Sequence, residues 1–176
     1  MRLNLSDARK GYSKAVREGM AMLEAEYILC LDSDGQCDPS DFAAFWDNRG
    51  SADIIIGRRV HRADTILRRL FSRTFYILYQ AAFRTKVHDP SCPFVLFPKV
   101  VAQRLAGELG AMQEGFWWEF VARAHRRGFT IRELPVNHKV RAAGVTQVYG
   151  FIKMPGIFFR HVGALLTIWR ETRPKA

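Results

Sequence analysis

The stretch YILCLDSDGQCDP, residues 27–39, decides the class of fold. Tyr27–Leu31 is an unbroken apolar run, long enough for a buried strand and too short for a helix. The run stops at residues 32–35 (DSDG), and a helix start follows, with Asp38 as its cap and Pro39 in its first turn. The stretch therefore predicts a buried strand, a carboxylate-rich loop and a helix, in that order.

The same alternation continues on both sides of this stretch. Further helices are predicted at about 7–25, 64–83, 99–109 and 116–127, and further strands at 52–57, 95–97 and 129–138. Strands that alternate with helices in this way predict an α/β sheet domain.

Length and charge limit the possible classes of protein. The chain has 176 residues, which suits one domain, and its 48% hydrophobic and 25% charged residues exclude a disordered tail or a membrane bundle. Residues 1–57 carry 6 basic and 10 acidic side chains, whereas residues 58–176 carry 21 and 7, for a total of +10. The basic remainder suggests a partner with negative charge, such as phosphate, lipid headgroup or nucleic acid.

The cysteines and the first residues indicate the compartment. Cys30, Cys37 and Cys92 form no CxxC pair, which excludes a disulfide framework or a zinc site and favours a reducing environment. The first 19 residues contain no apolar core, so we expect no signal peptide.

The C-terminal stretch allows two interpretations. Residues 150–169 are rich in Phe, Ile, Leu and Met, but Lys153, Pro155 and Arg160 interrupt them, so a spanning helix is not expected. The stretch could be a basic amphipathic segment in the membrane interface or a last helix packed on the domain. We predict a catalytic domain at 1–149 and this amphipathic segment at 150–176.

Asp32 and Asp34 give the sharpest local signal. They are two residues apart at the carboxyl end of a strand, so their side chains are expected to point the same way. Two carboxylates side by side repel, and a divalent cation relieves the repulsion. Magnesium is held by one or two carboxylates with phosphates and water, and ligands of α/β sheets lie beyond the strand ends. The alternative is an ordinary turn and helix cap.

Several segments, in this order, resemble the family 2 glycosyltransferases, and in particular the branch that uses polyprenyl-phosphate acceptors. They are RKGYSKAVREGMAMLEAEYILCLDSDGQCDP (9–39), ADIIIGRRV (52–60), VHDPSCPFVLFPK (87–99) and GFTIRELPVNHKVRAAGVT (128–146). The resemblance implies a GT-A-like, three-layer α/β/α domain. The family's first strands, with an Asn-Glu turn that holds the base, have no counterpart here. We therefore expect an incomplete N-terminal part and little or no transferase activity from this chain alone.

The reaction that the resemblance implies is inverting, metal-dependent transfer of a sugar from a nucleotide-sugar donor. Asp32 and Asp34 are then the ligands of Mg²⁺ or Mn²⁺, with Gln36 as a third; Asp32 could instead face the ribose. Arg141 is the candidate cation for the donor diphosphate, because a guanidinium grips phosphate through two bonds. Its alternative is a surface arginine.

A loop with Gly144 and Thr146 would close over the donor in such an enzyme. Arg59 matches the family's Gly-x-Arg position. Together with Arg69 and Arg73, which are four residues apart on one helix face, it could hold an acceptor phosphate near the membrane.

The need for a general base depends on the acceptor. A lipid phosphate is already an anion, whereas a sugar hydroxyl must lose its proton to a carboxylate. Asp89 is the preferred candidate and Glu119 the other, although Asp89 could simply cap a turn before proline. Trp118 could stack on a sugar, or it could belong to the core.

The expected partners are thus a nucleotide-sugar donor, a lipid-phosphate or glycan acceptor and an anionic membrane surface, at the cytoplasmic face of a membrane. The alternative function is a non-catalytic membrane-surface or partner-binding module that retains the fold. Nucleic acid is not expected, because the basic residues are spread without a reading motif.

Overall fold

A computed structural model of the chain describes residues 10–60, 66–139 and 154–173. Its elements are α1 (Tyr12–Met22), β1 (Tyr27–Cys30), the short 3-10 helix η1 (Pro39–Asp41), α2 (Phe42–Asp47), β2 (Ile54–Arg59), α3 (Ile66–Phe83), β3 (Val95–Pro98), α4 (Lys99–Leu105), α5 (Phe116–Arg126), β4 (Ile131–Val136) and α6 (Met154–Glu171). The predicted helices and strands are therefore present, with their ends displaced by a few residues.

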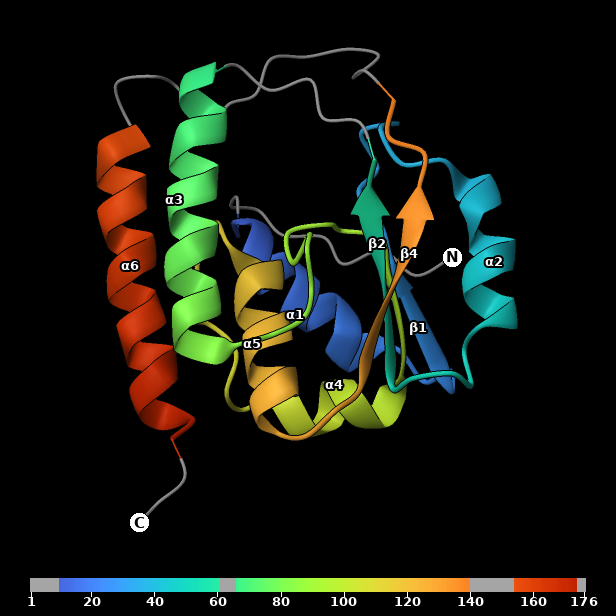
Figure 1. Cartoon of the computed structure of the whole chain (residues 1–176). Helices are drawn as coiled ribbons and strands as arrows, with labels where there is room; N and C mark the ends of the chain where they lie inside the picture. Colours follow the sequence, from blue (N-terminus) through green and yellow to red (C-terminus); the bar gives the residue numbers. More distant parts are fainter. Residues whose placement is uncertain (1–9, 61–65, 140–153, 174–176) are drawn as a thin grey trace.

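The described strands form one sheet in the order β1-β3-β2-β4. Strand β3 runs antiparallel to both β1 and β2, with Ile28 opposite Phe97 and Ile55 opposite Leu96. Strands β2 and β4 pair in parallel. Because β1, β2 and β4 share one direction, their carboxyl ends lie at the same end of the sheet, as the arrowheads of β2 and β4 show in Figure 1.

Helices cover both faces of the sheet (Figure 1). Helix α2 covers one face, where the rings of Phe45 and Phe94 lie 4.6 Å apart. Helices α1, α4 and α5 cover the other face, where Phe97 of β3 meets Phe120 of α5 at 5.0 Å. Helices α3 and α6 pack outside α5. The fold thus has the α/β/α layers that the sequence predicts.

Helix α6 lies within the predicted C-terminal segment and packs on the domain. Ile157, Leu165 and Ile168 are buried, and the helix contacts α3 and α5. Phe159 and Leu166 point outward, with 72% and 50% of their surface exposed. The helix is therefore part of the folded unit and also presents apolar side chains to the outside. A search of the described helices finds none that is long and apolar enough to cross a membrane.

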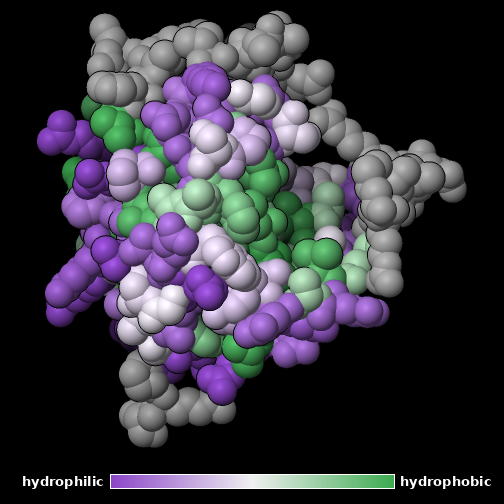
Figure 2. Space-filling view, turned by 90° about the vertical axis from the view of Figure 1, so that its right-hand side faces the viewer, coloured by the Kyte–Doolittle hydropathy of each residue, from purple (hydrophilic) through white to green (hydrophobic). Residues whose placement is uncertain are grey.

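Strand β1 lies at an edge of the described sheet, beside apolar side chains that are partly exposed. A cavity of about 350 Å³ runs between β1 and α1, and its wall includes Met22, Leu23 and Leu31. On the neighbouring helix α2, Phe42 and Trp46 are exposed as well. Figure 2, which views the molecule from this side, shows hydrophobic residues gathered among the hydrophilic ones.

Gly57 in β2 lies close to Cys92 in the loop before β3 and to Val136 in β4. A Cβ atom at this position would lie 2.8 Å from Sγ of Cys92 and 2.9 Å from Cγ1 of Val136. Both neighbours are buried, so neither can move aside freely.

We expect Gly57→Ala to lower the free energy of unfolding by about 1–3 kcal/mol, because the added methyl overpacks the core. The matched control is Gly163→Ala on α6, where an added Cβ meets nothing within 4 Å. That variant should keep its stability or gain up to about 1 kcal/mol from helix propensity. Urea unfolding measures both changes, and equal midpoints for the two variants would contradict the proposed close approach.

Candidate active site at the carboxyl ends of the strands

The loop after β1 holds Asp32 and Asp34 in defined positions. The phenol Oη of Tyr12 donates a hydrogen bond to Oδ1 of Asp32 at 2.9 Å. The backbone N–H of Gln36 donates to Oδ1 of Asp34 at 3.1 Å, and Gly35 makes the turn with a φ of +75°. Both carboxylates are half-buried. The loop is therefore built around its two carboxylates.

Cys37 shows that the predicted charges lie close together. Burial, and then the negative charges of Asp32 and Asp34, raise the pKa of this thiol to about 11, against an opposing effect of the Arg59 guanidinium. The Cys37 side chain is buried. The two carboxylates of the β1 loop and the arginine at the end of β2 are therefore near enough to act electrostatically on the same buried thiol.

The donor set fits a hard divalent cation that also binds substrate oxygens. Among the residues that the structure describes, no group of three or more His, Cys, Asp or Glu side chains forms a metal cage. Two carboxylates would leave the remaining positions to phosphate and water, which is the coordination that Mg²⁺ and Mn²⁺ accept. The side-chain nitrogen of Gln36 donates to the carbonyl of Lys139 at 3.3 Å, so its amide oxygen would have to be the third ligand.

Arg59 and Asp89 form a two-pronged ion pair at the end of β2. Nε and Nη2 of Arg59 each lie 2.7 Å from one carboxylate oxygen of Asp89, and Ser91 Oγ donates to the same carboxylate at 2.9 Å. Asp89 is only 6% exposed. A carboxylate held in this way orients a guanidinium. The geometry therefore favours a positioning role for Asp89 over the predicted role of proton acceptor.

Glu133 supports this pair and was not among the predicted site residues. Its Oε1 accepts hydrogen bonds from the backbone N–H groups of His88 and Asp89 at 2.9 and 2.8 Å, and its Oε2 lies 2.7 Å from Nδ1 of His88. Glu133 thereby fixes the turn that carries Asp89. A carboxylate on the same face as Ile131 in an alternating strand was the signal that could have identified it.

Glu119 is fully buried on α5, and the neighbouring Trp118 is partly buried against the core. Both oxygens of the fully buried Glu119 accept from backbone N–H groups at residues 110–112, and Oε1 also accepts from Nε of Arg123 at 2.9 Å. The Trp118 ring packs edge-on against Phe75 and Tyr79, each at 4.9 Å. These contacts favour structural roles over the predicted contacts with substrate.

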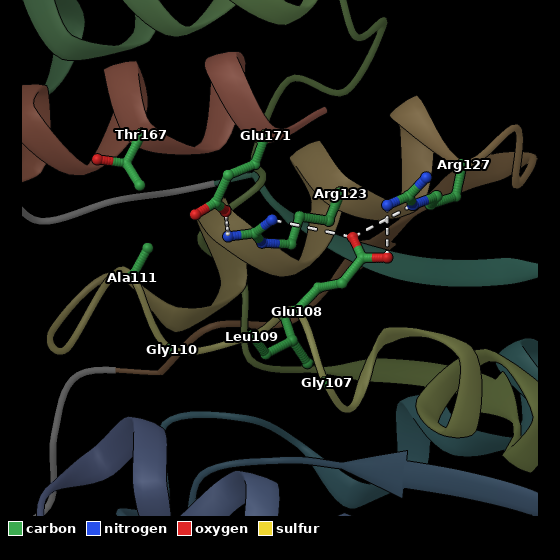
Figure 3. Close-up of a pocket in the computed structure, with 9 residues that line it drawn as sticks. All are labelled: Gly107, Glu108, Leu109, Gly110, Ala111, Arg123, Arg127, Thr167 and Glu171. Carbon is green, nitrogen blue, oxygen red and sulfur yellow. Dashed lines mark hydrogen bonds and ion pairs between the residues drawn. The ribbon is translucent and has the colours of Figure 1, made fainter. Parts of the chain in front are cut away.

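A cavity of about 430 Å³, shown in Figure 3, has Arg123, the partner of Glu119, in its wall. Arg123 reaches Glu171 of α6 at 2.7 Å and Glu108 at 3.9 Å, and Arg127 also pairs with Glu108. The charged groups on the cavity wall thus pair with one another and join α6 to α5.

The remaining predicted residues can be placed only in part. Arg73 is exposed on α3. The side chain of Arg69 lies outside the described residues, and so do Arg141, Gly144 and Thr146. Their predicted contacts with donor and acceptor stay predictions.

We expect Glu119→Ala to lower the free energy of unfolding by about 3–5 kcal/mol, because it leaves Arg123 and three backbone N–H groups without their buried acceptor. The control is Glu108→Ala, which removes a partly exposed partner of Arg127 and should change stability by about 0–1 kcal/mol. Denaturant unfolding of both variants measures the difference. Similar losses would show that Glu119 does not anchor the loop.

The sequence of this chain is similar to those of known glycosyltransferases. The sequence is 26% identical over 140 residues to a dolichyl-phosphate beta-glucosyltransferase of Dictyostelium discoideum. The aligned region covers 73% of this chain and 43% of that protein. The sequence is also 27% identical over 178 residues to an uncharacterised glycosyltransferase of Mycobacterium tuberculosis, covering 93% of this chain and 73% of that protein.

Solved structures of glucosyl-3-phosphoglycerate synthase from M. tuberculosis share the fold. The complex with phosphoglyceric acid matches with a TM-score of 0.69 at 12% identity, covering 97% of this chain and 59% of that chain. The complex with Mn²⁺, uridine-diphosphate-glucose and phosphoglyceric acid gives a TM-score of 0.64 at 12% identity, with 97% and 58% covered. These matches confirm the predicted GT-A-like fold. This chain spans 43% to 59% of the length of these two named enzymes.

The family itself follows from the sequence that surrounds the strand-end site. A family model described as glycosyl transferase family 2 matches residues 4–106, which include Asp32, Asp34, Arg59 and Asp89. The chain belongs to glycosyl transferase family 2.

Proposed function

We propose that this chain carries the metal- and acceptor-binding part of an inverting sugar transferase that uses a nucleotide-sugar donor. The observation that carries the proposal is the pair Asp32 and Asp34 at the end of β1, with the Arg59–Asp89 pair beside it. The solved complex with Mn²⁺ and uridine-diphosphate-glucose, on the same fold, supports this choice of donor and cation.

In this proposal Asp32 and Asp34 hold a divalent cation, with Gln36 as the third candidate ligand. A bound cation would stabilise the negative charge that develops on the departing nucleoside diphosphate. Arg59, fixed by Asp89, supplies a second positive charge at the same end of the sheet. A fixed cation costs no reorganisation when the charge develops, so the ion pair prepares the site before substrate arrives.

The acceptor in the proposal carries a phosphate. The names of two of the matched proteins contain a phosphate-bearing molecule, dolichyl-phosphate in one and phosphoglycerate in the other. A phosphate oxygen is already an anion, so transfer to it needs no general base. This agrees with the geometry of Asp89, which holds Arg59 and is almost fully buried.

A lipid phosphate at an anionic membrane surface is the specific acceptor that we propose, at the cytoplasmic face. Helix α3 exposes Leu70 and Ile77 by 62% and 59%, and α6 exposes Phe159 and Leu166 by 72% and 50%. Each pair is seven residues apart and so shares one side of its helix. Arg73 on α3 and Arg170 on α6 are also exposed and would attract anionic headgroups.

A second function, a non-catalytic binding module, is favoured by one observation. The chain spans 43% and 59% of the two named enzymes, so the purified chain is expected to turn over weakly or not at all. Clear turnover by the 176-residue chain would decide against this second function.

If Asp32 and Asp34 bind the cation, the affinity for Mn²⁺ should depend on the Asp34 carboxylate. Mn²⁺ binding, measured by calorimetry with and without uridine diphosphate, should weaken about 10-fold or more in Asp34→Asn, which removes one ligand charge. The neutral amide keeps an oxygen for the Gln36 N–H. Asp47→Asn on exposed α2 is the control and should bind as the native chain does. Equal binding by both variants would remove Asp34 from the metal site.

The membrane proposal predicts flotation with anionic vesicles of phosphatidylserine and phosphatidylcholine. Phe159→Asp combined with Leu166→Asp should abolish flotation, because the charges oppose insertion of the exposed face of α6. Phe42→Asp on α2, at the opposite side of the sheet, is the control and should float normally. Unchanged flotation of the α6 double variant would rule out this face of α6 as the binding surface.

A further inference from the structure

Tyr12 links the candidate metal loop to the helix layer behind it. The indole Nε1 of Trp117 on α5 donates to the phenol Oη of Tyr12 at 2.8 Å, and this Oη donates to Oδ1 of Asp32 at 2.9 Å. Three elements that are distant in the sequence, namely the start of α1, the end of β1 and the start of α5, thus meet through one hydroxyl.

The direction of this chain of hydrogen bonds is fixed by chemistry. An indole N–H can only donate, so the phenol oxygen must accept from Trp117. The single hydroxyl hydrogen of Tyr12 then points to Asp32, and the carboxylate accepts the hydrogen bond. Because Trp117 is almost fully buried, its N–H keeps this orientation.

The backbone that carries Tyr12 is held just as firmly. Helix α1 begins at Tyr12, and the N–H of Ala15 bonds to the carbonyl of Gly11 at 3.1 Å in its first turn. Nη1 of Arg17 donates to the carbonyl of Leu109 at 2.9 Å, which ties α1 to the loop after α4. The hydroxyl of Tyr12 therefore has a fixed place relative to β1.

The contact lies at the edge of a cavity and is accessible to solvent. Tyr12, Asp32 and Trp117 lie together on the wall of the cavity of about 350 Å³ beside β1, where the other wall residues include Met20 and Leu29. Tyr12 is 40% exposed and Asp32 is half-buried, so an ion from solvent can reach the carboxylate at this position. A hydrogen bond to an ionised acceptor is stronger than one between neutral groups.

We infer that Tyr12 is a positioning residue for Asp32, and that Trp117 sets the direction of the Tyr12 hydroxyl. By bonding to Oδ1, the hydroxyl restricts the rotation of the carboxylate that would ligate the cation. This inference rests on the proposed function, in which Asp32 is a metal ligand. Groups that orient metal ligands in this way change metal affinity by about 10–100-fold when they are removed.

The test is the affinity for Mn²⁺ alone, measured from the electron paramagnetic resonance signal of free Mn²⁺. Tyr12→Phe deletes only the hydroxyl and should weaken Mn²⁺ binding about 10-fold. Trp117→Phe should weaken it in the same direction by a smaller factor, because the Tyr12 hydroxyl remains but is free to rotate.

The matched control is Tyr76→Phe on α3, which deletes a hydroxyl that donates to the carbonyl of Val87 at 3.2 Å. It should bind Mn²⁺ as the native chain does. Urea unfolding of Tyr12→Phe and Tyr76→Phe separates the two possible roles of the hydroxyl. A positioning role predicts weaker Mn²⁺ binding by Tyr12→Phe under conditions where urea unfolding shows the variant to be fully folded, even though losing the acceptor of the buried Trp117 N–H also costs stability. A merely structural role predicts an affinity that falls only as the folded fraction falls.

The outcomes separate this inference from the proposed function. If the native chain binds Mn²⁺ and Asp34→Asn does not, but Tyr12→Phe binds as tightly as the native chain, the role of Tyr12 is wrong and the metal site stands. If the native chain does not bind Mn²⁺, the metal site fails and the role of Tyr12 fails with it.

Discussion

Strand β3 is hydrogen-bonded to β1 on one side and to β2 on the other, and it is antiparallel to both. This pairing places β1 and β2 in the same direction although they are not neighbours, and β4 joins β2 in parallel. The loop after β1 and the end of β2 therefore open at the same end of the sheet. The convergence of Asp32, Asp34 and Arg59 depends on this arrangement.

Carboxylates serve two different purposes in this structure. Asp89 binds the Arg59 guanidinium through both oxygens, and Glu119 binds backbone N–H groups through both. Glu133 binds two backbone N–H groups through Oε1 and the ring of His88 through Oε2, and so fixes the turn that carries Asp89. Asp32 and Asp34 are more exposed than Asp89 and Glu119, and they lie together on one loop. Local pairing thus stabilises the scaffold, while the charge at the strand end is held where a ligand can reach it.

Much of this could be predicted from local pattern. The apolar run at 27–31 predicted β1, and the spacing of Asp32 and Asp34 predicted two carboxylates at its end, because both features depend on residues that are adjacent in the chain. The order of the strands could not be predicted, since it depends on pairing between residues about 70 positions apart, as with Ile28 and Phe97.

The structural role of Glu119 and the link through Tyr12 were also hidden from the sequence. The backbone partners of Glu119 lie in a loop before its own helix, and the partners of Tyr12 lie in the loop after β1 and on α5. A carboxylate or a phenol has the same appearance in a sequence whether it faces substrate or a backbone N–H. Only the packing of the helices on the sheet distinguishes the two.

The edge position of β1 has a consequence for the electric field at the site. Its outer backbone groups can bond a further strand, and the exposed Met22, Leu23 and Leu31 offer that strand an apolar surface. A strand added there would displace water from one side of the loop that begins at Asp32. In that drier environment the charges of Asp32, Asp34 and Arg59 would act on one another and on a ligand more strongly. Pairing along the edge of the described sheet would then strengthen the interactions of the loop after β1.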